Sequence, residues 1–369
     1  MAIKKTKIGI IGCGNIASAY MTAGQRLDIL DIVACADLVP DRAKCKAEEH
    51  GVGRACGIEE LLADPEIEIV VNLTVPHAHA EIAIATLEAG KNAYSEKPFA
   101  VTREDGQKIL KLAAEKGLLV GCAPDTFLGA GIQTARKLLD DGWIGDVIGA
   151  SAHMLGHGPE RWHPDPNFFY QPGAGPLFDM GPYYLTALTN LIGATKSVAS
   201  SAIASFPERL IGSAPHYGEM IKVNTPTHVN GILEFETGAI GTLTTSFDVW
   251  ASTHIPIEIY GSEGSMQVPD PNTFGGIVRV KRAEHEAWMD VPLTHLYSEQ
   301  NRGLGVADMA YALRSGRKHR ASGELAYHVL DIMHTLYDAS RERRYVDLQS
   351  RVDRPAALPI GLTPKTLDE

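Results

Sequence analysis

The stretch that decides the fold of this chain is Lys7-Ile8-Gly9-Ile10-Ile11-Gly12-Cys13-Gly14-Asn15-Ile16-Ala17. Its first five residues are typical of a buried strand, which runs directly into a glycine turn and then into a helix. Gly12 permits the tight turn, Gly14 lets the backbone approach a pyrophosphate, and the small Ala17 lets the helix pack on the strand. The positive end of the helix dipole points at the phosphates. The stretch therefore predicts a dinucleotide site whose contacts are Gly12, Gly14, Asn15 and Ile16.

An acidic residue after the next strand indicates which dinucleotide is bound. Residues 31–36 read as a second strand, which ends at Asp37, about twenty residues past the turn. A carboxylate there accepts hydrogen bonds from the adenosine ribose and repels a 2′-phosphate. No arginine stands immediately beside Asp37, although Arg42 lies five residues on. The sequence therefore favours NAD over NADP, and a strand–helix turn without any ligand is the alternative.

Strands and helices continue to alternate after Asp37, which predicts a doubly wound α/β Rossmann domain over residues 1–124. A capping box at Thr102 opens one of the helices, and Gly117 closes it. The other predicted elements are strands at 67–74, 92–95 and 118–122 and helices at 41–50 and 80–89. Ligands of such sheets bind outside the carboxyl ends of the strands. Residues 12–17, 37, 74–76 and 95–98 are therefore expected along one rim.

The pattern changes at Pro124, and residues 125–345 predict an α+β domain for substrate binding and oligomerisation. Its strands, in a large and mainly antiparallel sheet, are expected at 147–153, 229–236, 239–250, 256–261 and 277–281, with a hairpin turn at Thr237-Gly238. Its helices are expected at 132–141, 179–192, 305–315 and 324–340. A sheet with one apolar face often pairs with another subunit, so we expect a homodimer or homotetramer. Residues 346–369 read as a C-terminal arm or tail.

The composition is that of an ordinary soluble globular protein, with 44% hydrophobic and 21% charged residues in a chain of 369. The formal net charge of −11 disfavours nucleic acid or an anionic membrane surface as partner, because both require a basic footprint. Residues 1–6 lead directly into the first strand and no apolar run reaches membrane-spanning length, so we expect no signal peptide and no membrane span. The five cysteines include no CxxC pair, which favours reduced thiols and a cytoplasmic location.

A second motif, Ser95-Glu96-Lys97-Pro98, ends the strand at 92–95. Together with the glycine turn and the loop Val75-Pro76-His77-Ala78-His79-Ala80-Glu81, it makes residues 6–340 resemble the glucose–fructose oxidoreductase/inositol dehydrogenase (Gfo/Idh/MocA) family. The resemblance implies that Lys97 lies beside the nicotinamide and the reacting hydroxyl. It also implies an NAD(P)-dependent dehydrogenase that oxidises a secondary alcohol of a sugar, glycoside or cyclitol, or reduces the ketone. The cofactor contacts expected from the two loops are Thr74, Pro76, His79, Glu96 and Lys97.

A further family motif corresponds here to residues 173–186, in which Asp179 is kept. The usual histidine is replaced by Tyr183 and the distal aspartate by Thr186. Asp179 is expected to cap a helix that carries Tyr183 one turn later, so that both project toward Lys97. The Lys97 ammonium would lower the pKa of Tyr183 by favouring the phenolate. We therefore expect Lys97 and Tyr183 to share the proton-relay role, with Asp179 orienting one of them, so that all three are catalytic residues. The alternative is that Asp179 is only an N-cap and Tyr183 only packs.

Residues 156–170 form a long loop rich in polar and aromatic residues, which suit a polyol ring. Alternatively, the loop folds down and packs its own Trp162 and Phe169. His153, His157 and His163 provide no close-spaced ligand pair on a helix, and no cysteine lies nearby, so no metal site is expected. The predicted substrate contacts are Asp125, His157, Arg161, Trp162 and His163.

Three functions are compatible with these patterns. The first is net hydride transfer between NAD and a sugar, glycoside or cyclitol. The second is transient oxidation of a glycoside ring hydroxyl, followed by elimination and return of the hydride without net NADH. The third is a non-catalytic dinucleotide sensor, which would not need the lysine of Glu96-Lys97-Pro98.

Overall fold

The N-terminal part of the protein is a parallel sheet with helices packed against it, as the sequence predicted, but it has six strands rather than the five expected. The computed structural model describes residues 4–363 and 368. The strand order is β3-β2-β1-β4-β5-β6, and every neighbouring pair is parallel. The strands are β1 (Thr6–Ile11), β2 (Leu30–Ala36), β3 (Ala55–Cys56), β4 (Ile69–Asn72), β5 (Asn92–Ser95) and β6 (Val120–Cys122). The sequence did not predict β3, because a two-residue strand has no alternating pattern.

The helices of this part begin where the sequence places their start signals. Thr102 caps α5: its side chain accepts a hydrogen bond from the backbone N–H of Asp105 and donates one to the Asp105 carboxylate. Gly117 ends α5 in the left-handed conformation, with φ of 64°. The helices are α1 (Ala17–Arg26), α2 (Pro40–His50), α3 (Ile58–Ala63), α4 (His79–Glu88) and α5 (Arg103–Lys116). The short α3 was not predicted.

The sheet reverses its strand order between β1 and β4, and the turns after these two strands lie against each other. Gly12 has φ of +101°, and a Cβ atom there would lie 2.6 Å from the backbone carbon of Leu73. Only glycine fits this place, because both the conformation and the space exclude a side chain. Ligands of doubly wound sheets bind at such a switch point, outside the carboxyl ends of the strands.

The C-terminal part contains a nine-stranded sheet that is mainly antiparallel, with one parallel pair between β7 and β12. The predicted hairpin turn is confirmed, since Gly238 N–H donates to Phe235 O between β11 and β12. The strands, in sheet order, are β16 (Met289–Val291), β15 (Val278–Arg282), β14 (Gly264–Val268), β13 (Ile257–Gly261), β7 (Val147–Leu155), β12 (Ile240–Ser246), β11 (His228–Phe235), β8 (Thr195–Ile203) and β17 (Val346–Asp347). Four of them were not predicted: β8, β14, β16 and β17. A separate hairpin of β9 (Glu208–Leu210) and β10 (Met220–Lys222) was also missed.

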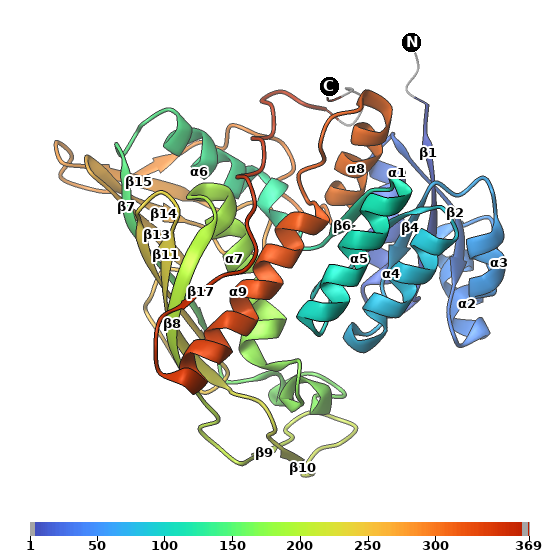
Figure 1. Cartoon of the computed structure of the whole chain (residues 1–369), viewed down its shortest axis with the longest axis horizontal. Coiled ribbons are helices and arrows are strands. Elements are labelled where there is room, and N and C mark those ends of the chain that lie inside the picture. Colours follow the sequence, from blue (N-terminus) through green and yellow to red (C-terminus); the bar gives the residue numbers. More distant parts are fainter. Residues whose placement is uncertain (1–3, 364–367, 369) are drawn as a thin grey trace.

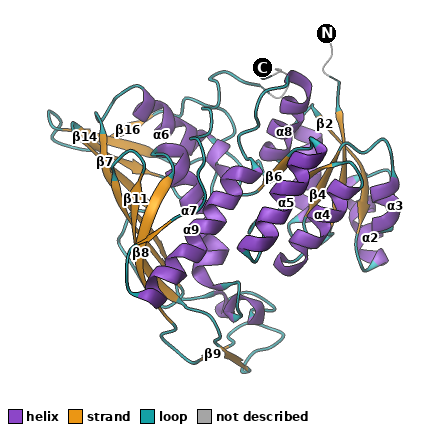
Figure 2. Cartoon of the chain, in the orientation of Figure 1, coloured by secondary structure: helices purple, strands orange, loops and turns teal. Residues whose placement is uncertain are grey.

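Helices separate the two sheets, as Figures 1 and 2 show. The long helix α9 (Gly323–Glu342) contacts β8 on one side and α5 on the other. The remaining helices are α6 (Ala130–Asp140), α7 (Gly175–Leu191) and α8 (Leu304–Ser315). One cluster of buried apolar side chains includes residues of β1, α5, α7, α9 and the large sheet. A continuous hydrophobic core therefore crosses the junction between the two sheets.

Helix α7 begins four residues earlier than predicted, which corrects the expected role of Asp179. The helix starts at Gly175, with Ala174 at the N-cap and Pro176 in its first turn. Gly175 has φ of +81°, and a Cβ atom there would lie 2.7 Å from Pro226 O. The sequence pattern missed this start because the helix lacks a side-chain cap. Asp179 lies in the second turn and is not the N-cap.

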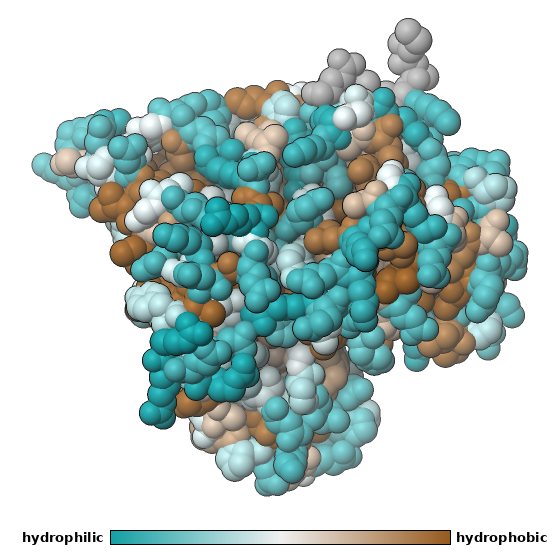
Figure 3. Space-filling view, in the orientation of Figure 1, coloured by the Kyte–Doolittle hydropathy of each residue, from teal (hydrophilic) through white to brown (hydrophobic). Residues whose placement is uncertain are grey.

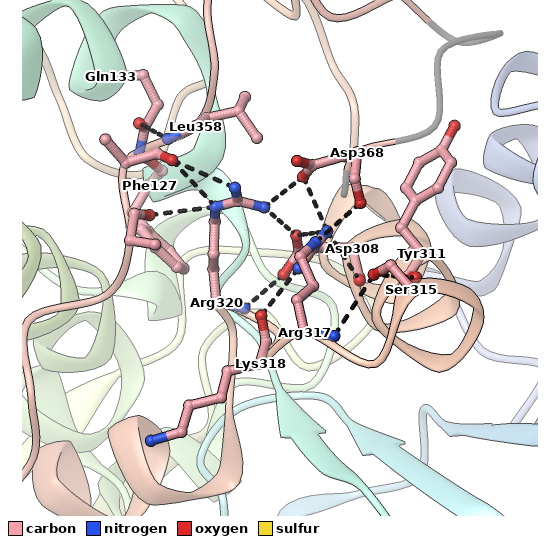
Figure 4. A network of polar contacts seen from close by, with 12 residues as sticks. Phe127, Gln133, Asp308, Tyr311, Ser315, Arg317, Lys318, Arg320, Leu358 and Asp368 are labelled. Carbon is pink, nitrogen blue, oxygen red and sulfur yellow. Dashed lines mark hydrogen bonds and ion pairs between the residues drawn. The ribbon is translucent and has the colours of Figure 1, made fainter.

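The segment after α9 runs back across the molecule. Its first residues form β17, which pairs with β8, and Leu358 is buried, with its backbone N–H bonded to the side chain of Gln133. Asp368 accepts hydrogen bonds from Arg317 and Arg320, both of which also contact Asp308 (Figure 4). The described residues of the predicted arm are therefore bound to β8, to Gln133 and to the two arginines that follow α8.

The face shown in Figure 3 is mainly polar and carries scattered small apolar patches. Figure 3 shows hydrophilic side chains over most of one face, with separate brown patches among them. Among the residues described, no helix is both long and apolar enough to cross a membrane.

Candidate active site

An ion pair joins the two parts of the protein at the predicted Lys97 and Asp179. Lys97 follows β5 and Glu96, and its ammonium donates to both the carboxylate and the backbone oxygen of Asp179, each at 2.7 Å. The same ammonium lies 5.4 Å from the centre of the Tyr183 ring. The side chains of Lys97 and Asp179 are 17% and 24% exposed. The structure thus brings the three residues proposed as catalytic into contact.

Lys97 is held in its charged form. Burial alone would lower the pKa of Lys97, but the nearby Asp179 carboxylate more than offsets this, so the pKa lies above its ordinary value. An ammonium with a raised pKa is a hydrogen-bond donor and a fixed positive charge at neutral pH. It can orient a substrate oxygen and stabilise negative charge on it.

The pKa of Tyr183 is raised, whereas the sequence analysis expected it to be lowered, so that prediction was wrong. Its side chain is only 6% exposed, and burial raises the pKa of the phenol. Lys97 and Arg302 both act in the lowering direction, but burial outweighs them. The sequence could not show how deeply the ring is buried. Tyr183 is a neutral phenol at neutral pH and therefore a proton donor.

Sequence reasoning missed one residue of this cluster, Arg302. Its guanidinium donates to the Tyr183 hydroxyl at 3.1 Å and to the side-chain oxygen of Asn272 at 3.0 Å. Arg302 stands in the loop immediately before α8, with no motif or spacing that would distinguish it from other arginines. Thr186, which stands where the family has an aspartate, lies one turn beyond Tyr183. It lines a small cavity together with Lys97 and Pro182.

Glu96 does not pair with the Lys97 ammonium. Its carboxylate accepts from the Tyr20 hydroxyl of α1 at 2.8 Å and from the backbone N–H of Lys97 at 3.0 Å. These bonds hold the carboxylate between α1 and the loop after β5. Glu96 thereby ties the start of the lysine motif to the helix that follows the glycine turn.

The glycine turn has the properties that a dinucleotide phosphate requires. Gly14 and Asn15 are exposed, and a Cβ atom on Gly14 would meet nothing within 4 Å, so the backbone is open to a ligand. Ile16, at the N-cap of α1, is half-buried, and no acidic residue lies in the first helical turn. The free N–H groups of a helix start attract phosphate. These residues therefore fit the pyrophosphate of NAD.

Asp37 lies beside this turn, after β2. One of its carboxylate oxygens accepts from Cys13 N–H at 2.8 Å, and the other accepts from Val39 N–H at 2.9 Å. Both bonds fix the carboxylate at the rim of the sheet, and Leu38 beside it is 88% exposed. A negative charge held here fits an adenosine ribose and disfavours a 2′-phosphate.

His79 and Thr74 are connected below the rim. His79 is 1% exposed, with Nδ1 2.7 Å from Pro98 O and Nε2 3.0 Å from Thr74 O. Thr74 in turn uses its N–H and hydroxyl to bond the side-chain oxygen of Asn72, while Pro76 opens a single turn of 3-10 helix. Both ring nitrogens of His79 thus face backbone carbonyl oxygens, and the N–H of the neutral ring donates to one of them. The side chain links the two loops from below, and Thr74 and Pro76 are half-buried at the rim.

Asp125 is turned toward α8. It is 1% exposed, and one carboxylate oxygen accepts from the backbone N–H groups of Gly303 and Gly305, at 2.8 and 3.0 Å. Burial raises the pKa of Asp125 to about 6, although these two bonds act in the lowering direction. Asp125 therefore fixes the start of α8, directly after Arg302, and its predicted substrate contact stays a prediction.

The loop at 156–170 forms a separate aromatic group. His157 stacks on Trp250 with ring centres 3.4 Å apart, and the Arg161 guanidinium lies 5.2 Å from the same indole ring. Phe169 is buried, as the folded-down alternative predicted, whereas Trp162 is 68% exposed and makes a T-shaped contact with His163. None of the contacts found for these four predicted substrate residues reaches Lys97, Asp179 or Tyr183.

His153 of the loop's preceding strand stacks on His254 with centres 4.2 Å apart. Within residues 4–363 and 368, no three His, Cys, Asp or Glu side chains lie close enough together to hold a metal ion.

The fold and this arrangement define a dinucleotide-binding oxidoreductase with a separate sheet domain, and the chain belongs to the Gfo/Idh/MocA family. Residues 6–123 match the family description "Oxidoreductase family, NAD-binding Rossmann fold", and residues 132–267 match "GFO/IDH/MocA C-terminal domain".

The chain is also similar to oxidoreductases whose reactions are assigned. The 1,5-anhydro-D-fructose reductase of Ensifer adhaerens is 26% identical over 303 residues, 78% of this chain and 84% of that enzyme. The NADP-dependent scyllo-inositol 2-dehydrogenase of Bacillus subtilis is 28% identical over 54% of this chain, which spans about half of that enzyme's length (55%). Among solved structures, levoglucosan dehydrogenase in complex with NADH and L-sorbose has a TM-score of 0.81 at 22% identity, over 94% of this chain and 99% of that one. At 22% identity, the similarity to levoglucosan dehydrogenase shows a shared fold only.

Proposed function

We propose that this protein is an NAD(H)-dependent oxidoreductase that transfers hydride between the nicotinamide and a secondary alcohol, or its ketone, on a sugar, glycoside or cyclitol. The observation that carries this proposal is the Lys97 ammonium, held by Asp179 above the ring of Tyr183. The relatives named above, which act on an anhydrosugar and an inositol, support the substrate class.

The residues supply what a hydride transfer needs at the oxygen atom. NAD(H), when bound, accepts or supplies the hydride itself. In the direction of ketone reduction, Lys97 donates a hydrogen bond to the carbonyl oxygen and stabilises the negative charge that develops on it. Tyr183 donates its proton to that oxygen, and Lys97 and Arg302 stabilise the phenolate until water reprotonates it. Alcohol oxidation uses the same steps in reverse.

Cofactor choice follows from Asp37, whose fixed carboxylate favours NAD over NADP. The proposed cofactor contacts are Gly12, Gly14, Asn15, Ile16, Asp37, Thr74, Pro76, Glu96 and Lys97, with His79 acting from below through the two loops.

The test is absorbance at 340 nm, with NAD and separately NADP, against sugars, glycosides, inositols and their ketones. We expect turnover with NAD for one class of substrate, and a loss of at least about 100-fold in the Lys97→Met variant. Absence of turnover across the panel, with NAD binding demonstrated by calorimetry, would reject net hydride transfer. The same mixtures are assayed for released aglycone, which would reveal a transient redox reaction.

A further inference from the structure

Arg302 differs from the other arginines of this protein in what it binds. Every other buried or half-buried arginine in the described part of the chain forms an ion pair with at least one carboxylate: Arg54, Arg103, Arg136, Arg209, Arg279, Arg282, Arg314, Arg317, Arg320 and Arg354. Arg302 is half-buried, yet none of the described carboxylates lies within ion-pair distance of it. Its partners are the Tyr183 hydroxyl, the Asn272 side-chain oxygen and, at 3.2 Å, that of Gln300. A desolvated guanidinium with only neutral partners retains an unmet preference for an anion.

The carboxylates around Lys97, Tyr183 and Arg302 are already committed to other donors. Asp179 is bound by the Lys97 ammonium, and Glu96 by the Tyr20 hydroxyl and the Lys97 N–H. Asp125 accepts from Gly303 and Gly305 N–H. Glu96 and Asp125 therefore act on Arg302 only through longer-range attraction, and neither offers the paired oxygen atoms that a guanidinium fork prefers.

The backbone beside Arg302 is held on two sides. Gly303 has φ of +101°, and a Cβ atom there would lie 2.5 Å from the Cβ atom of Ala23 in α1. Asp125 holds the N–H groups of Gly303 and Gly305 from the other side. The guanidinium is therefore presented from a hydrogen-bonded turn, directly beside the hydroxyl of Tyr183. A rigid fork loses little conformational entropy when it binds a ligand.

We propose that Arg302 binds a carboxylate of the substrate, so that the preferred substrates are acidic polyols: aldonates, uronates or related hydroxy acids. The carboxylate is carried by the same molecule as the reacting carbinol, because Arg302 and Lys97 flank the same tyrosine. This inference rests on the proposed function and narrows its substrate class. An anionic group of the cofactor is the other possible source of the charge, and the experiment separates the two.

The experiment compares acid and neutral members of matched pairs (xylonate and xylose, glucuronate and glucose, galactonate and galactose) with NAD at saturation. The quantity measured is the ratio of kcat/KM for the acid to kcat/KM for the neutral sugar. In the wild-type protein this ratio is expected to exceed about 10 for at least one pair, and Arg302→Gln should lower it by about 10- to 100-fold. Any effect of Arg302 on the proton of Tyr183 changes both rates and cancels in the ratio. Arg302→Lys should restore the ratio in part, and Gln300→Ala, which leaves the charge in place, should keep it near the wild-type value.

Three results would overturn the proposal. The first is a preference for neutral sugars in the wild-type protein. The second is an equal loss for acid and neutral substrates in Arg302→Gln. The third is a rise confined to the KM for NAD, which would assign the guanidinium to the cofactor.

A binding measurement keeps this inference separate from the proposed function. If the NAD-loaded protein turns over none of the substrates, thermal shift is measured with the same acids and neutral sugars. Protection by an acid that is lost in Arg302→Gln would support the anion site while the hydride-transfer function fails. Equal protection, or none, in both proteins would reject the anion site.

Discussion

The role of Tyr183 can be tested by removing one atom. In Tyr183→Phe the ring stays in place between Lys97 and the core of α7, and only the hydroxyl is lost. Arg302 loses one of its partners but keeps its bond to Asn272 at 3.0 Å. The lost bond joins a neutral acceptor to a guanidinium, so we expect the free energy of unfolding to fall by about 1–2 kcal/mol. The variant should therefore remain folded.

The expected loss of rate is much larger than the loss of stability. A positioned general acid contributes about 100- to 10,000-fold to a rate, equivalent to about 3–5 kcal/mol of activation free energy. Turnover in both directions should fall by this amount, because the same hydroxyl gives and takes the proton. The KM values should change by less than about threefold, since binding depends on other groups.

The assay is the absorbance change at 340 nm under saturating substrate, together with urea unfolding of the same preparations. Tyr184→Phe is the matched control, because Tyr184 is equally buried, at 4% exposed, but follows Tyr183 on a different face of α7. We expect that control to keep wild-type turnover. Tyr183→His, which places the family's usual residue here, should restore activity with a pH profile governed by an imidazole near pH 6–7. Turnover of Tyr183→Phe above about one third of the wild type would refute the assignment.

Three further predictions concern the rim and the support of α8. Gly12→Ala should lower the free energy of unfolding by about 1–3 kcal/mol, since φ is +101° and Leu73 lies against it. Gly14→Ala should keep the wild-type free energy of unfolding and raise only the KM for NAD. Urea titration and cofactor kinetics distinguish the two variants. Asp37→Ser should raise the ratio of NADP to NAD efficiency at least about tenfold, and an unchanged ratio would argue against a ribose contact. The folded pKa of Asp125, about 6, exceeds its ordinary value of 3.8, so ionisation opposes folding: relative to Asp125→Asn, wild-type unfolding free energy should fall between pH 4 and pH 6 and then stay level. Parallel pH dependence of the two proteins would contradict this.

The parts of the fold that the sequence predicted are those set by local rules. Gly12, the Thr102 cap and the turn at Gly238 each belong to a short motif with a strong residue preference, so their elements were placed within a few residues. The strands β3 and β17 consist of two residues each and exist only because a neighbouring strand pairs with them. No periodic pattern can reveal such a strand.

The residues of the candidate site also fall into those that sequence motifs predicted and those that only the tertiary structure reveals. Lys97, Asp179 and Tyr183 were found through motifs, and the structure brings them together. Arg302 was not found, because it lies 119 residues beyond Tyr183 and reaches it only through the folding of the loop before α8. The pKa of Tyr183 was predicted in the wrong direction for a related reason: its partners can be guessed from the motif, but the burial that outweighs them belongs to the tertiary structure.

The contact between Lys97 and Asp179 has a consequence for how this protein responds to mutation. One partner follows a strand of the first sheet and the other lies on α7, so the distance between them measures the alignment of two layers. Helix α9 lies between α5 and β8, so a change of side-chain volume along it would alter that alignment as well as the packing of the core. A shift of about 1 Å can cost about 100-fold in rate while leaving the fold intact. Variants on the buried faces of α9, far from the site, are therefore expected to lose rate by more than their loss of stability alone would explain.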